Sequence, residues 1–139
     1  MRIKLASQKG AALVEFALIL IPLVILTFGL IEFGLIMYNQ QVITNAAREG
    51  ARYGIVMTEN PGDISMDMIE QVVREYAETR LIYATVKDPN ADTTCGPGTF
   101  GSSLTVSITC DYTYLLINNF LPGLGNTIEL ASQAVMRCE

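Results

Sequence analysis

An uncharged apolar run near the N-terminus dominates the pattern of hydrophobic and polar positions. Residues 16–31 read FALILIPLVILTFGLI and contain no charged side chain. A helix from Ala11 to Ile31, rising about 1.5 Å per residue, is about 30 Å long, which matches the hydrocarbon core of a bilayer. The pattern therefore predicts one membrane-spanning helix, kinked or loosened at Pro22.

The helical pattern continues beyond this run. After Glu32, apolar and small residues recur at spacings near three and four. We expect one long helix that ends near Met57, before the turn-forming residues 59–62. A second helix is predicted to begin with Asp63 or Ser65 as its N-cap. Its expected apolar stripe consists of Ile69, Val72, Val73, Tyr76 and Ala77.

Two later segments alternate between apolar and polar residues, which is typical of strands with one buried face. They are residues 104–114 and 127–138, and residues 118–126 form the expected connection between them. A shorter strand is predicted at 82–86, whereas 88–103 is interpreted as a loop. The predicted fold class is α+β, with a long N-terminal helix, one further helix and an antiparallel sheet of about three strands.

Charge is distributed unevenly along the chain and indicates a topology. Arg2, Lys4 and Lys9 precede the apolar run without any acidic residue among them. This pattern favours a cytoplasmic N-terminus and an extracytoplasmic C-terminal domain. We therefore divide the chain into a basic leader (1–10), a membrane and amphipathic helix (11–57) and an α+β domain (58–139). Without residues 1–10 the net charge changes from −5 to −8, because three basic residues are lost, and this charge argues against a nucleic-acid partner.

The composition limits the chemistry that the chain can perform. Histidine is absent, which removes the usual general base and the commonest metal ligand. We therefore expect no enzyme, no cofactor and no metal site. The three cysteines allow one disulfide and one free thiol, and the sequence does not fix their pairing. We prefer a bridge between Cys95 and Cys138, because Cys110 lies on the apolar face of a predicted strand.

The junction between the leader and the apolar run contains an unexpected carboxylate. Glu15 lies one turn inside the predicted span. An unpaired charge within a span is costly, about 2.5 kcal/mol or more near the bilayer centre. If a peptidase cut after Gly10, the new α-amino group of Ala11 would lie one helical turn from Glu15. It would neutralise that carboxylate in the same subunit or in a neighbour. The simpler alternative is that Glu15 extends to the membrane surface.

Small residues also recur later in the long helix. Ala46, Gly50 and Gly54 are each four positions apart, which creates a smooth face for close helix packing. That face can serve a neighbouring subunit or the protein's own domain, and the sequence leaves both readings open. The charged residues between them form a solvated helix surface, or Glu49 pairs with a basic residue of a neighbouring subunit; these residues are Arg48, Glu49 and Arg52.

Two motifs carry a family resemblance. Gly10 followed by Glu15 and Phe16 resembles the class III signal peptides of type IV pilins, although the aromatic residue of the major pilin is most often Tyr. The segment 45–54, NAAREGARYG, is similar to the Ala-Arg-Glu-Gly-Ala-Arg segment of TadE-like pseudopilins, and 32–34 also fits that family. These pseudopilins belong to the Tad system, which assembles Flp pili.

The resemblance implies a structural minor pilin in the bacterial inner membrane, taking part in assembly of Flp pili for adherence. Its implied partners are other pilins and a prepilin peptidase that cuts between Gly10 and Ala11. The assembly residues would be Glu15 and Phe16, together with the closely packing Gly50 and Gly54. An ordinary signal peptide is disfavoured, because no small-x-small cleavage site follows the apolar run. The remaining alternative is an unprocessed single-span protein with an extracytoplasmic binding domain.

Overall fold

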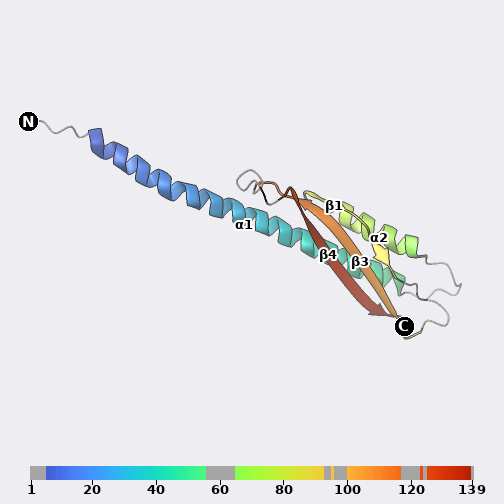
Figure 1. Cartoon of the computed structure of the whole chain (residues 1–139). Coiled ribbons are helices and arrows are strands. Elements are labelled where there is room, and N and C mark those ends of the chain that lie inside the picture. The colour runs from blue at the N-terminus through green and yellow to red at the C-terminus, as the bar shows by residue number, and fades with distance from the viewer. Residues whose placement is uncertain are drawn as a thin grey trace, which may run out of the picture.

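The computed structural model describes residues 6–55, 65–92, 95, 100–116, 123 and 125–138. Its architecture is α+β, as the sequence predicts, with two helices and one antiparallel sheet (Figure 1). The elements in chain order are α1 (Ala6–Gly54), α2 (Met66–Glu78), β1 (Ala84–Val86), β2 (Asn90–Ala91), β3 (Ser103–Thr113) and β4 (Thr127–Arg137).

The sheet is built around β3. Strand β4 pairs with it over the whole length, from Ser103 opposite Arg137 to Thr113 opposite Thr127. Strands β1 and β2 pair with different stretches of β3 on its other edge. Sequence analysis expected about three strands and assigned β2 to a loop. That assignment was wrong, because a strand of two residues is too short to show an alternating pattern.

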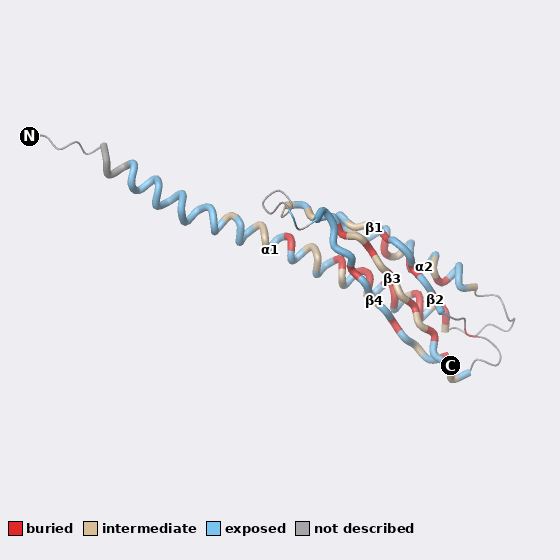
Figure 2. Tube along the Cα trace, in the orientation of Figure 1, coloured by how far each residue is buried: buried red, intermediate tan, exposed pale blue. Residues whose placement is uncertain are grey.

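Both helices cover the same face of the sheet, and α1 extends far beyond it on the N-terminal side (Figures 1 and 2). The predicted faces are largely those that pack. On β3 the alternating residues from Leu104 to Tyr112 are fully buried, and on α2 the buried residues are Ile69, Val73 and Ala77. Ile128 departs from the expected pattern of β4, because its side chain is 36% exposed.

The ends of the helices refine the sequence prediction. Helix α1 begins at Ala6 and runs through the Gly10–Ala11 boundary and through Pro22 to Gly54. The expected end near Met57 and the candidate cap Asp63 lie outside the described residues. Ser65 is the N-cap of α2, and its hydroxyl oxygen accepts a hydrogen bond from the Met68 N–H at 3.3 Å.

Candidate functional site

The N-terminal half of α1 has an apolar surface that no other described part of the chain covers. Between Gly10 and Ile31 the side chains are exposed or half-buried, and this helix is long and apolar enough to cross a membrane (Figure 2). Glu15 and Phe16 both lie on this bare surface, and Phe16 is 63% exposed. A helix that is apolar on all sides requires lipid or other apolar helices around it.

Gly10 and Glu15 lie on one continuous helix. A Cβ atom added at Gly10 would meet no heavy atom of the described residues within 4 Å, so packing against them does not require glycine there. This geometry is compatible with recognition by a peptidase, as the sequence suggests.

At the point where the apolar run ends, Glu32 joins α1 to the sheet. Its side chain is fully buried and accepts three hydrogen bonds. The Tyr112 hydroxyl donates to Oε1 at 2.6 Å, and the N–H groups of Leu115 and Leu116 donate to Oε1 and Oε2 at 2.9 Å each. Burial and then the hydrogen bond to Glu32 raise the pKa of Tyr112, so the phenol stays protonated as the donor.

Two turns further along α1, Asn39 makes a second buried polar contact. Its side-chain amide donates to the Ile82 carbonyl at 2.8 Å and its oxygen accepts from the Ile82 N–H at 2.9 Å. The neighbouring side chains add bonds on either side: the Tyr38 hydroxyl donates to the Arg80 carbonyl at 3.2 Å, and the Gln40 amide donates to the Ala131 carbonyl at 3.0 Å. These bonds and those of Glu32 fix the sheet on α1.

The small residues of segment 45–54 bring α1 close to its own domain. A Cβ atom at Gly54 would lie 2.5 Å from Leu104 Cδ2 and 2.7 Å from Ile69 Cδ1, and one at Gly50 would overlap Val73. The small-residue face is therefore buried within the domain, which is one of the two readings that the sequence leaves open. Because this face is already occupied, a neighbouring helix has no access to Gly50 or Gly54.

The charged residues of the same segment point away from this contact. Arg52 donates to Glu49 at 2.7 Å, with the Arg52 side chain 71% exposed. The hydrogen bond from Arg52 holds the pKa of Glu49 below its usual value. The small residues of this segment are thus buried, whereas Arg52 and Glu49 form an ion pair in contact with solvent. Such an ion pair contributes little to stability.

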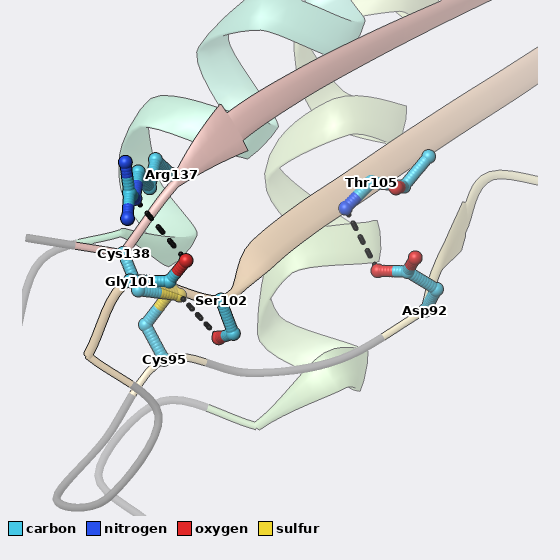
Figure 3. The surroundings of a disulfide bond; sticks show 7 residues. All are labelled: Asp92, Cys95, Gly101, Ser102, Thr105, Arg137 and Cys138. Carbon is cyan, nitrogen blue, oxygen red and sulfur yellow. Dashed lines mark hydrogen bonds between the residues drawn. A yellow bond between two sulfur atoms is a disulfide. The ribbon is translucent and has the colours of Figure 1, made fainter.

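The structure places a disulfide between Cys95 and Cys138, the pair that the sequence analysis preferred (Figure 3). It ties the segment after β2 to the end of β4. Around it, the Ser102 hydroxyl donates to Cys138 Sγ at 3.4 Å, and Arg137 Nε donates to the Gly101 carbonyl at 3.1 Å. Cys110 is a free thiol on the buried face of β3, and burial raises its pKa to about 11.

Among the described residues there is no group of three or more His, Cys, Asp or Glu side chains placed to hold a metal ion. An open groove of about 380 Å³ lies between α1 and α2. Its lining residues are Glu49, Val72, Glu75, Tyr76, Thr79 and Arg80. Arg80 in this groove stacks on the Tyr76 ring at 3.9 Å, which is a structural contact.

Sequence reasoning missed the roles of Glu32 and Asn39. In the sequence, Glu32 is distinguished only as part of segment 32–34, which fits the family pattern, and nothing local distinguishes Asn39. A signal was present, because Glu32, Asn39, Ile43 and Ala46 repeat at spacings that lie on one helix face. A polar residue on an otherwise apolar face is buried only where a partner satisfies it, and those partners lie about 40 to 80 residues away in sequence.

Comparison with known proteins supplies one match. Residues 10–52 match the model of the family described as TadE-like protein. The resemblance suspected from the sequence is thereby confirmed for this segment, which contains the bare apolar surface and most of the residues that hold the domain. No curated protein and no solved structure matches the chain.

Proposed function

We propose that this chain is a minor pilin, a pseudopilin that takes part in assembling Flp pili of a Tad system for adherence. The match of residues 10–52 to the TadE-like family supports a role connected with that system. One observation carries the structural role: the N-terminal half of α1 is bare and apolar, whereas the C-terminal half is fixed into a domain. This is the construction expected of a subunit that is anchored by its helix and assembles through it.

In this proposal residues 1–10 are a leader, the bare half of α1 crosses the inner membrane, and the domain faces away from the cytoplasm. The three basic residues before Gly10 support this orientation. A prepilin peptidase is the first partner and removes the leader between Gly10 and Ala11. Other pilins of the system are the second class of partner.

Assembly would then use the bare surface around Glu15 and Phe16. The α-amino group created at Ala11 is a cation, and in the apolar setting of a helix bundle it pairs strongly with a carboxylate of a neighbour. That pairing would neutralise Glu15 and fix the stagger between two helices. Phe16 would pack beside it. Gly50 and Gly54 would act indirectly, by holding α1 in its domain, because both are buried there.

The test is the N-terminus of the protein purified from membranes. We expect the wild-type chain to start at Ala11 and the Gly10→Val variant to retain Met1. Gly29→Val is the matched control, because a Cβ there also meets open space on the same helix. It should be processed normally. A wild-type chain that starts at Met1 would favour the unprocessed membrane protein instead, and normal processing of Gly10→Val would overturn the assigned cleavage site.

A further inference from the structure

A second apolar surface surrounds α1 where the domain begins. It consists of six side chains that are between 37% and 59% exposed, and we call it the collar. The collar residues are Phe33, Met37 and Tyr38 on α1, Ile82 and Tyr83 before β1, and Leu115 after β3. None of them carries a charge, although the exposed Arg80 lies beside them, because its carbonyl accepts a hydrogen bond from the Tyr38 hydroxyl.

Hydrogen bonds show that the collar lies at the end of the domain nearest the bare helix. The Leu115 N–H binds Glu32, the first α1 residue after the apolar run. Ile82 is held by Asn39, and the Tyr83 carbonyl accepts from the Thr113 N–H at 2.8 Å, two residues before Leu115. In Figure 1 this end of β1 and β3 faces the exposed N-terminal half of α1. The collar is therefore continuous with the bare surface of the helix.

We propose that the collar is a lipid-contacting surface, so that this end of the domain sits in the membrane interface and is not held above it. The proposal rests on the proposed membrane anchoring. With residues 11–31 across the hydrocarbon core, Phe33 lies about 3 Å and Tyr38 about 10 Å beyond its edge, where the polar interfacial layer is about 5–8 Å thick. Because side chains on a helix tilt toward its N-terminus, the Tyr38 ring reaches back toward the layer that tyrosine rings prefer.

Two further observations support a lipid surface here. Tyr83 is the one non-glycine residue with positive φ in the described part of the chain, at 53°, and its side chain is 57% exposed. A bulky non-glycine residue rarely adopts this conformation, so the surrounding structure holds Tyr83 there with its ring exposed. The charged cluster of Lys87, Asp111 and Glu129 begins only beyond the collar, where its ion pairs stay in water.

The Glu32 carboxylate fits the same picture. Glu32 is enclosed by protein and accepts three hydrogen bonds, so its carboxylate is satisfied without water. One of these bonds comes from the backbone of the collar residue Leu115. The domain is held against the membrane at a fixed position instead of swinging on a linker.

The chain contains no tryptophan, so a single introduced tryptophan reports one position. We would place Tyr83→Trp, Leu26→Trp and Val135→Trp separately in the full chain, reconstituted in phosphatidylcholine and phosphatidylglycerol vesicles with brominated acyl chains. Leu26 lies in the bare helix, and Val135 is exposed on β4 near the other end of the domain. Leu115→Trp serves as a second collar probe if Tyr83→Trp perturbs the fold by circular dichroism.

We expect strong quenching at Leu26→Trp, none at Val135→Trp, and intermediate quenching with blue-shifted emission at the collar probe. Collar quenching equal to that of Val135→Trp, with Leu26→Trp still quenched, would overturn the lipid contact and point to a neighbouring subunit or water at the collar. Absence of quenching at Leu26→Trp would instead contradict the membrane anchoring itself. The two failures are therefore distinguishable.

Discussion

Replacing Glu32 by alanine should loosen the domain from α1. The change leaves the buried Tyr112 hydroxyl and the N–H groups of Leu115 and Leu116 without their acceptor. Each unsatisfied buried donor costs about 1–3 kcal/mol, and the three donors are one fully buried hydroxyl and two partly buried N–H groups. We therefore expect a loss of about 3–5 kcal/mol, a large share of the 5–15 kcal/mol typical of a domain.

The free thiol of Cys110 provides the assay. It is fully buried, so a thiol reagent labels it only when the domain opens. At about 1.4 kcal/mol per factor of ten, the expected loss accelerates labelling in the membrane-reconstituted chain by about 10²- to 4 × 10³-fold when opening is in rapid equilibrium. The disulfide stays intact, because the reagent is used without reductant.

Two variants bracket this prediction. Tyr112→Phe removes one donor but leaves Glu32 with its two backbone partners, so it should cost about 1 kcal/mol. Glu49→Ala removes an exposed carboxylate from the same helix and should change the labelling rate little. If Glu32→Ala accelerates labelling no more than Glu49→Ala does, the hydrogen bonds to Glu32 do not hold the domain and the argument fails.

Further predictions concern other parts of the chain. Glu15→Ala should leave the helix inserted but reduce crosslinking to partner pilins, and unchanged crosslinking would make Glu15 a tolerated charge. Gly54→Val should destabilise the domain by about 1–3 kcal/mol through overpacking, seen as a lower midpoint of chemical denaturation. Cys138→Ser and Cys95→Ser should each cost about 2–4 kcal/mol and lower the melting temperature equally; unequal effects would show that one cysteine acts separately from the bridge. Burial raises the Cys110 pKa from 9.0 to about 11, so its contribution to stability is complete below pH 9 and is lost as pH rises toward 11. As pH rises from about 8 to about 10.5, the denaturant concentration at the unfolding midpoint should therefore decrease. Cys110→Ala should make that decrease smaller.

The elements that the sequence determined are those with a strong local pattern. The uncharged run, the apolar stripe of α2 and the alternation of β3 each repeat over many residues, so their periods predict helix or strand without knowledge of the fold. The Gly10 and Glu15 spacing and the segment 45–54 were also readable locally, and the family match over residues 10–52 contains the first and most of the second. Strand β2 was not predicted, because its two residues are too few to show an alternating pattern.

What only the tertiary structure decided is where the polar and small residues of α1 find their partners. Glu32 and Tyr112 are 80 positions apart, and nothing near either residue specifies the other. The same holds for Gly54, whose small size is explained by Leu104 and Ile69 and not by a neighbouring subunit. Helical period shows that such residues share a face, but the packing of distant elements determines whether that face meets lipid, another subunit or the protein's own sheet.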